Sequence, residues 1–517
     1  MRDAADVPGT SSRTASGRSA VTIGAAPLAL DDVVAIARDR APVALSDAAQ
    51  ARLAAARAFV DREAHGAVAV YGLNSALGAN TGRPLAAADL SSYQARAVRA
   101  RAVGVGARYG RATVRAMLAA RVAGMAAGGS GVSPAVVDAL VALLNRGVHP
   151  CVPRHGSIGA ADLPQLAHLA LPLLGEGDAE VDGEVMDGAA ALARAGLSAV
   201  VLGPKDGLAL VSANAATIGR AALVLHDART LFARWLETIA LSFEGFRANV
   251  SVLDPRVIAA RPAPGQADVA ARLSSLVAGG TLTSATARRV QDPLSFRVVA
   301  PVHGAGAWML GEAIRIVEIE LNAAADSPLV APDGALLSNG NFQMPALAVA
   351  LDALAIAIAQ MASLAAGRIQ RFMSPVLTDL PLQLTRHGPA HSGFATLQKT
   401  TIALLADVRH RANPASLDFL PVSEGVEDHA TMTLACIEKL AEALPRVRYL
   451  VAIERIVAAQ AIDLRGLPPG ELGPHGRALH SRIRAQVAML DDDRPLGPDI
   501  ERCAHAVCRL TTDDETA

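Results

Sequence analysis

Apolar residues recur along most of this chain every three or four positions, which is the spacing of one face of a helix. The pattern predicts a mainly α protein with few and short strands. Ser46 and Asp47 offer an N-cap to the first long helix, and a strand-like run is expected at 67–70. The longest expected helices cover residues 48–62, 87–103, 111–127, 134–145, 208–239, 305–321, 346–363 and 396–410.

Two glycine-containing loops interrupt the helical pattern in the first third of the chain. Residues 71–82 read YGLNSALGANTG, and residues 150–166 read PCVPRHGSIGAADLPQL. Glycine lets the backbone turn sharply and approach a ligand closely, so both loops are candidates for a binding site. We expect a disordered tail at 1–20, an N-terminal domain with both loops at 21–205, and a central helical bundle domain at 206–517.

The charges of the 517 residues nearly cancel, because 48 Lys and Arg oppose 49 Asp and Glu to leave a net charge of −1. Nucleic-acid binding is not expected without a positive field, and aromatic residues, at 3%, are too few for base-stacking platforms. Four cysteines are too few for a disulfide framework, which favours a cytoplasmic location. None of the 13 histidines belongs to an HExxH motif, and no metal site is expected.

Residues 346–367, ALAVALDALAIAIAQMASLAAG, are long enough to span a membrane. Asp352 and Gln360 interrupt this run, and neither an aromatic belt nor a partner span flanked by Lys or Arg accompanies it. Residues 1–20 lack the apolar core of a signal peptide. We therefore expect a helix buried in the bundle, and no membrane association.

Short motifs between residues 71 and 429 occur in the order found in one enzyme family. They are Tyr71-Gly72 with Gly78, GSIG at 156–159, Asp162-Leu163, LLGEG at 173–177, DGLAL at 206–210, QDPLSFR at 291–297, ELNAAADSPLV at 320–330, NGNF at 339–342 and NPASLDFLPVSEGVEDH at 413–429. Each motif is weak alone. Together they make the chain resemble the histidine, phenylalanine and tyrosine ammonia-lyases, which form the aromatic amino acid lyase family.

This resemblance implies the ammonia-lyase fold, with a long central helical bundle and a smaller N-terminal α+β part that carries the active-site loops. It also implies a homotetramer whose active sites are assembled by loops from more than one subunit. The substrate implied by the family is a small-molecule carboxylate.

The second loop departs from the family where the family makes its electrophile, a methylidene-imidazolone (MIO) group. Family members form MIO from consecutive Ala-Ser-Gly: the glycine nitrogen attacks the alanine carbonyl, and the serine side chain loses water. Here the loop reads Gly159-Ala160-Ala161-Asp162, which is one residue shorter and lacks both serine and glycine. Ala161 has no oxygen to eliminate, so we expect that no MIO forms and that no other cofactor is present.

Positions around this loop also differ from the family. Residues 212–214 replace an Asn-Gly-Thr, Leu294 stands where the family has a tyrosine, and Ser327 replaces an asparagine. Arg101 stands where the family often has a histidine that tunes ring selectivity. The candidate substrate-binding residues from these comparisons are Arg101, Ser212, Asn214, Leu294 and Gln343.

Three chemical groups of the family are retained. The resemblance gives Tyr71 the role of the base that removes the β-proton of the substrate. It gives Arg297 the role of binding the substrate carboxylate, for which the planar guanidinium fork is suited. Glu427 matches a glutamate near the amine, so Tyr71 and Glu427 are the catalytic candidates.

A lyase without the electrophile needs a substrate whose leaving group is already activated, and a quaternary trimethylammonium is such a group. This points to an enzyme of the ergothionase type, which removes trimethylamine from the betaine of a sulfur-bearing histidine. Tyr71 would take the β-proton, Glu427 would face the cation, and Arg101 would donate to the thione. Two alternatives stay open: a non-eliminating enzyme on the same scaffold, and a catalytically silent homologue kept for binding or assembly.

Overall fold

The computed structural model describes residues 19–64, 70–76, 80, 82–85 and 90–510. Most of the tail predicted at 1–20, most of the strand-like run predicted at 67–70, and Gly78 lie outside the described residues.

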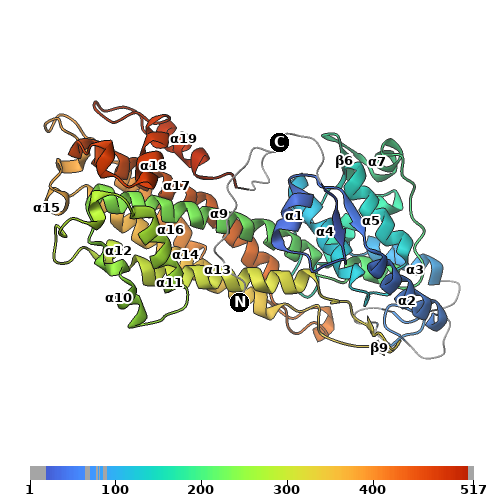
Figure 1. Ribbon diagram of the computed structural model, residues 1–517. Coiled ribbons are helices and arrows are strands. Elements are labelled where there is room, and N and C mark those ends of the chain that lie inside the picture. Colours follow the sequence, from blue (N-terminus) through green and yellow to red (C-terminus); the bar gives the residue numbers. More distant parts are fainter. Residues whose placement is uncertain (1–18, 65–69, 77–79, 81, 86–89, 511–517) are drawn as a thin grey trace.

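Four long helices form the centre of the described chain: α9 (Ala215–Phe246), α13 (Val299–Leu321), α14 (Pro345–Phe372) and α17 (Thr433–Arg465). They run along the length of the molecule (Figure 1), and α17 packs against both α9 and α14 while α13 packs against α14. Alanine is frequent on their buried faces, where its small side chain allows helices to approach closely at no cost in helix propensity. The predicted central helical bundle is thus confirmed.

The helix predicted at 208–239 is in fact two helices, α8 (Asp206–Val211) and α9. Ser212 and Asn214 have non-helical backbone angles at the junction, with φ of −92° and −109°. A continuous helix would join Thr217 N to Ala213 O, but Thr217 N donates to Asp162 Oδ2 and Ala213 O accepts from Asp162 N, which explains why the helix breaks here. Periodicity alone could not show this break, because apolar residues continue through it.

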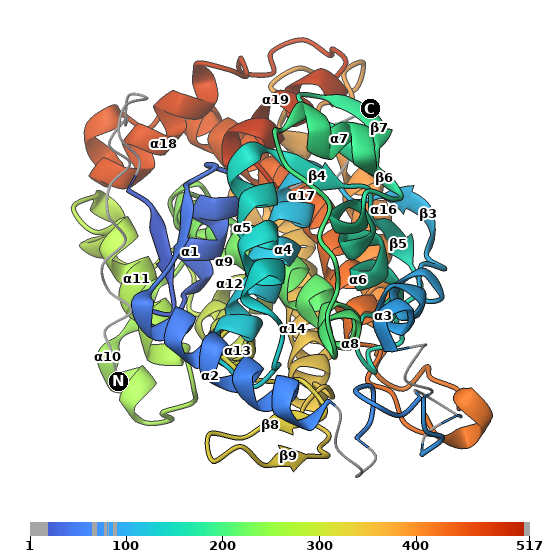
Figure 2. The same ribbon diagram turned by 90° about the vertical axis from the view of Figure 1, so that its right-hand side faces the viewer.

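The N-terminal part surrounds one end of the bundle, as Figures 1 and 2 show, and α4 packs along α9. The predicted N-cap is confirmed, since Ser46 Oγ accepts a hydrogen bond from Ala49 N at 3.1 Å. The helices here are α1 (Leu30–Ala37), α2 (Asp47–Glu63), α3 (Leu90–Arg99), α4 (Arg111–Ala126), α5 (Pro134–Arg146), α6 (Leu163–Ala170), η2 (Leu171–Leu174) and α7 (Gly188–Arg194).

Small sheets accompany these helices. In the first sheet β1 (Val21–Ile23) is parallel to β2 (Val43–Leu45), and the other three sheets are antiparallel. Those three are β3 (Val105–Arg108) with β5 (Pro153–His155), β6 (Asp178–Val181) between β4 (Val148–Pro150) and β7 (Glu184–Asp187), and β8 (Leu329–Val330) with β9 (Leu336–Leu337).

The opposite end of the bundle carries short helices and loops (Figure 1). The remaining elements of the described chain are η3 (Val250–Leu253), α10 (Pro255–Ala259), α11 (Gln266–Val277), η4 (Thr281–Thr283), α12 (Leu294–Arg297), α15 (Pro375–Thr378), η5 (Leu382–Leu384), α16 (Leu397–His410), η6 (Ser423–Gly425), η7 (Pro469–Glu471), α18 (Pro474–Arg484) and α19 (Gly497–Val507).

A continuous hydrophobic core runs from Ile23 to Leu510 and includes residues on both sides of position 205, so the domain division there stays a prediction. Two helical stretches, Asp206–Phe246 and Pro345–Phe372, are long and apolar enough to cross a membrane. Of their most apolar windows, 94% and 61% are buried inside the protein, which is also what core helices show. The helix predicted at 346–367 therefore lies within α14 of the bundle, as expected.

Candidate active site

The loop at residues 157–162 is fixed by Asp162, whose side chain is fully buried. Asp162 Oδ1 accepts hydrogen bonds from Ser157 Oγ at 2.7 Å and from Thr217 Oγ1 at 2.9 Å, and Oδ2 accepts one from Thr217 N at 2.7 Å. Asp162 is the N-cap residue of α6, and Thr217 lies in the first turn of α9. One carboxylate thus joins the starts of two helices. Burial raises the pKa of Asp162, and these hydrogen bonds oppose the rise.

The same loop contacts the segments that begin two further helices. Ala160 forms a backbone bridge with Gln343, two residues before α14, and Met432 N donates to Ile158 O at 2.8 Å just before α17. Gly159 has a φ of +83°, and a Cβ there would lie 2.9 Å from Met432 N, so the close approach requires glycine. The positive ends of four helix dipoles therefore converge on this loop.

Residues 160–162 do not provide the atoms from which the family makes MIO. Ala160 and Ala161 are buried and have no side-chain oxygen. Ala161 has a φ of +64°, a region that favours glycine. The backbone nitrogen of Asp162 follows directly and already donates to Ala213 O at 2.7 Å. These residues do not fit the group.

Tyr71 lies in a tight turn and is 37% exposed. The buried side chain of Gln94 ties this turn to α8: its Nε2 donates to Gly72 O at 3.3 Å, and its Oε1 accepts from Gly207 N at 2.9 Å. Gln94 thus places the Tyr71 turn at the start of α8, the short helix that leads to Ser212 and α9. Sequence reasoning missed Gln94, because a glutamine that joins two distant segments has no signal in the sequence.

Asn214 and Gln343 lie beside the loop and present hydrogen-bond acceptors. Asn214 Nδ2 donates to Phe342 O, and Gln343 Nε2 donates to His429 O at 3.1 Å. Both side-chain oxygens are buried and have no partner among the described residues. Each amide nitrogen already donates to a carbonyl. The two side-chain oxygens can therefore accept a hydrogen bond from an N–H or O–H group.

Glu427 closes a tight turn that begins at Val422. Val422 N donates to Glu427 O at 3.0 Å, and Glu427 N donates back to Val422 O at 3.3 Å. Ser423 and Glu424 within the turn have φ of +56° and +55°, which is unfavourable for residues other than glycine. Ser423 Oγ donates to Glu427 Oε1 at 2.9 Å and fixes the half-buried carboxylate. The hydrogen bond to His429 O places this turn near Gln343.

Arg101 follows the end of α3, which packs against both α8 and α6. Its guanidinium donates to Ala97 O at 2.9 Å and has no carboxylate partner among the described residues. Ser212, at the end of α8, is half-buried. Both candidates thus belong to the same end of the molecule as Tyr71.

Arg297 and Leu294 belong to α12, at the end of the bundle opposite to the N-terminal part (Figure 1). Between them, the ring of Phe296 stacks on Phe246 with centroids 4.0 Å apart and meets Phe372 edge-on at 6.0 Å. Phe246 and Phe372 are the last residues of α9 and α14. Arg297 is exposed and has no hydrogen-bond or ion-pair partner in the described part of the chain.

Two groups of candidate residues lie at opposite ends of α9. Asn214 precedes the first residue of α9, and Phe246 is the last of its 32 residues. At roughly 1.5 Å per residue the helix is about 48 Å long. A single chain cannot bring Arg297 to Tyr71 and Glu427. If the three act on one substrate molecule, a second copy of the chain supplies Arg297.

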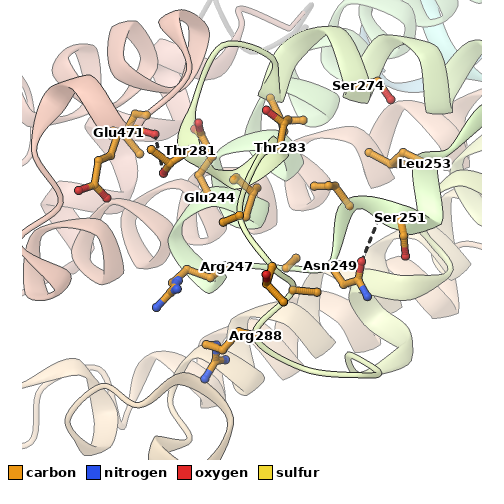
Figure 3. Close-up of a pocket in the computed structure, with 18 of the residues that line it drawn as sticks. Glu244, Arg247, Asn249, Ser251, Leu253, Ser274, Thr281, Thr283, Arg288 and Glu471 are labelled. Atoms are coloured by element: carbon orange, nitrogen blue, oxygen red, sulfur yellow. Dashed lines mark hydrogen bonds between the residues drawn. The ribbon is translucent and has the colours of Figure 1, made fainter.

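A cavity of about 710 Å³ lies at the end of the bundle where α9 finishes (Figure 3). Its walls include Glu244, Arg247, Asn249 and Thr281, and none of the candidate residues predicted from the sequence. Glu244 is buried, accepts a hydrogen bond from Gly473 N at 2.7 Å, and has its pKa raised to about 7 by burial. The cavity is therefore distinct from the loop at 157–162.

One pair of histidines has metal-like spacing but other partners. The rings of His387 and His391 lie 4.6 Å apart, and their Nε2 atoms contact Asp491 at 3.3 Å and Asp492 at 3.2 Å. Within the described ranges, no three His, Cys, Asp or Glu side chains are grouped so as to hold a metal ion.

Comparison with known proteins shows the family to which the chain belongs. A model of the aromatic amino acid lyase family matches residues 28–485. Histidine ammonia-lyase of Symbiobacterium thermophilum is 39% identical over 491 residues, which cover 94% of this chain and 96% of that enzyme. The chain belongs to the aromatic amino acid lyase family, as its motifs predicted, and is similar over nearly its whole length to carbon–nitrogen ammonia-lyases.

Two solved structures show how closely the whole fold agrees. Histidine ammonia-lyase from Trypanosoma cruzi has a TM-score of 0.86 and 31% identity, covering 94% of this chain and 92% of that one. The ergothioneine-degrading enzyme ergothionase from Treponema denticola, solved with desmethyl-ergothioneine sulfonic acid, has a TM-score of 0.90 and 32% identity. That similarity covers 95% of this chain and 98% of the ergothionase. The predicted ammonia-lyase fold is confirmed.

Proposed function

We propose that this protein is an MIO-independent lyase that eliminates trimethylamine from the betaine of an amino acid. The observation that carries the proposal is the loop at 160–162, which has neither the hydroxyl nor the glycine needed to form the family's electrophile. The similarity to an ergothioneine-degrading enzyme supports it and suggests ergothioneine as the first substrate to test.

The chemistry of a quaternary nitrogen explains why the electrophile is dispensable. Such a nitrogen has no lone pair and cannot add to MIO, and it already leaves as a neutral amine. In the proposed step the deprotonated Tyr71 oxygen takes a β-hydrogen as a proton. The electron pair of that C–H bond forms the Cα=Cβ double bond, and the pair of the broken Cα–N bond stays on nitrogen. The products are trimethylamine and an α,β-unsaturated carboxylate.

The positive helix ends at the loop at 157–162 repel a cation, so the trimethylammonium group is oriented toward Glu427. Arg297 of a second copy binds the substrate carboxylate as a bidentate pair. Arg101 donates to the electron-rich ring substituent, such as a thione. Asn214 Oδ1 and Gln343 Oε1, the two free acceptors, suit donors of the substrate, with Ser212 and Leu294 completing its surroundings.

We also propose the homotetramer, because the single chain leaves apolar side chains of the bundle uncovered. On α13 and α14, Trp308 is 48% exposed, Ile319 53%, Val349 63% and Ile356 42%. A row of exposed apolar residues on core helices is typical of an interface between subunits. A cytoplasmic location remains a prediction from composition.

Two measurements test the proposal. Purified protein incubated with ergothioneine should release trimethylamine and the conjugated acid, whereas histidine, the control, should release no ammonia. Finding neither product would remove ergothioneine as the substrate. The intact mass should equal the sequence mass, and a mass lower by two waters would contradict MIO independence. A catalytically silent homologue would bind ligand with the same affinity after Tyr71→Phe and turn over none of these substrates.

A further inference from the structure

Arg368 and Glu454 form an ion pair in the interior, each with 0% of its side chain exposed. Arg368 Nε lies 2.6 Å from Glu454 Oε1, and Arg368 Nη2 lies 3.0 Å from Oε2, so the pair is bidentate. Ser242 Oγ also donates to Glu454 Oε1, at 2.7 Å. These residues belong to α14, α17 and α9, so the pair joins three of the long helices near the end where α12 lies. A buried pair stabilises little unless its remaining groups are satisfied.

The third nitrogen of the Arg368 guanidinium, Nη1, contacts the helix that carries Arg297. Arg368 Nη1 donates to Ser295 O at 3.0 Å, and Ser295 lies two residues before Arg297 in α12. The last carbonyls of a helix lack partners within the helix, and Arg368 supplies one here. Gly367 precedes Arg368, and a Cβ on it would lie 3.0 Å from the Ser295 Cβ, so its missing side chain lets α12 approach α14 closely.

We propose that the buried Arg368–Glu454 pair is a positioning device for Arg297. Arg297 has no partner of its own in the described chain, so its place depends on how α12 is held. Phe296 packs against the bundle, and Arg368 fixes the adjacent carbonyl. A guanidinium presents N–H groups from three nitrogens in one plane, so it can bind a carboxylate with two of them and a carbonyl with the third. The three N–H groups of lysine diverge from a single nitrogen and do not match this fork, and an apolar residue has none. The inference rests on the proposed role of Arg297 in binding the substrate carboxylate.

The test replaces both charges at once, because removing one would leave the other buried and unpaired. The variant Arg368→Met/Glu454→Met should keep the fold but lose the hydrogen bond to Ser295 O. We expect KM for the carboxylate substrate to rise about tenfold, the equivalent of one charge-assisted hydrogen bond, with kcat nearly unchanged. Hydrogen–deuterium exchange should become faster in peptides that cover residues 293–298.

Arg455→Met is the matched control. Arg455 lies next to Glu454 in α17 and is buried. It donates to Thr238 Oγ1 at 2.9 Å and to Arg234 O at 3.3 Å and lies 3.9 Å from Glu237 Oε2, and none of these polar contacts within the described chain involves α12. This change should lower the melting temperature while KM and the exchange at 293–298 stay as in the native protein. Arg368→Lys is a second test if the double variant does not fold. It keeps the charge but loses the fork, so KM and exchange at 293–298 should both rise.

The outcomes separate this inference from the proposed function. A folded double variant, or Arg368→Lys, with native KM and native exchange at 293–298 would overturn the positioning role. The variant Arg297→Met tests the proposed function alone. If this change leaves KM for the substrate unchanged, Arg297 does not bind the carboxylate. In that case faster exchange at 293–298 in the double variant, absent from Arg455→Met, would still support the hold on α12.

Discussion

The two ends of the bundle hold their candidate residues by different means. At the loop at 157–162, position is set by the buried Asp162 carboxylate, which joins the starts of two helices, together with backbone hydrogen bonds and a close-packed glycine. At α12, position is set by side chains: stacked phenylalanines and the Arg368–Glu454 pair. The backbone contacts of this loop tolerate exchange of side chains: Ala161 and residues 212–214 differ from the family, while Asp162 is retained. At α12, Arg297 is retained within QDPLSFR, and the residue that differs from the family, Leu294, is 62% exposed.

The largest effect on activity is expected when Tyr71 and Arg297 are replaced, each on a different chain. Tyr71→Phe should lower the rate of trimethylamine release roughly 10²–10⁴-fold by removing the base. Arg297→Met should also be severely impaired. Co-expressing the two variants should restore a measurable share of the activity, because some sites then combine an intact Tyr71 with an intact Arg297. If the mixture is no more active than either variant alone, the two ends do not share a site.

A smaller effect, on the stability of the fold, is expected at Glu244 near α12. Burial raises the pKa of Glu244 from 4.5 to about 7. The folded state favours its neutral form, so its stabilising contribution is full below about pH 4.5 and is lost as the pH rises through 7. Glu244→Gln stays neutral and should gain stability relative to the native protein, by up to about 3 kcal/mol at pH 8 and little at pH 5.

Urea denaturation of the native protein and of Glu244→Gln, each at pH 5 and pH 8, measures this difference in the free energy of unfolding. The buried His149 and His303, whose pKa values burial lowers to about 3, destabilise the fold as pH falls below 6.5. They act equally in both proteins and cancel in the comparison. Parallel stability curves for the two proteins would show that Glu244 does not titrate in this way.

Asp162→Asn tests the anchor at the other end. The substitution replaces one acceptor oxygen by a donor that faces Ser157 or Thr217, so we expect a loss of about 1–3 kcal/mol in the free energy of unfolding at pH 7. Asp187, an exposed N-cap that accepts from Ala190 N at 3.0 Å, is the control. Asp187→Asn should change stability far less, since asparagine caps nearly as well. Equal losses in the two variants would rule out a special role for Asp162.

The smallest effect is expected at Ala161, whose φ is +64°. Ala161→Gly should raise stability by up to about 1 kcal/mol, because glycine adopts this conformation without strain. Ala160, which is absent from the positive-φ positions, should lose stability when changed to glycine. Thermal melts of the two variants provide the comparison, and a destabilised Ala161→Gly would show that the backbone there is not strained.

Motifs and periodicity predicted the family, the bundle and the cap at Ser46, because these depend on local pattern. The resemblance implied that more than one subunit builds a site, but that Arg297 is the residue separated from Tyr71 was not predictable, since a motif gives the role of a residue and not its distance from another. Gln94 and the Arg368–Glu454 pair were missed for a related reason. Arg368 and Glu454 are 86 positions apart, and only the packing of α14 on α17 brings them together.

The loop at 159–162 also makes its departure from the family hard to reverse by evolution. Ala161→Ser would restore a hydroxyl with one substitution. The next residue would still be Asp162, whose nitrogen donates to Ala213 O and whose carboxylate joins α6 to α9. Recovering Ala-Ser-Gly requires an inserted residue together with a substitution, and neither change is useful alone. Forming MIO in this loop would therefore take two coordinated changes beside the carboxylate that joins α6 to α9.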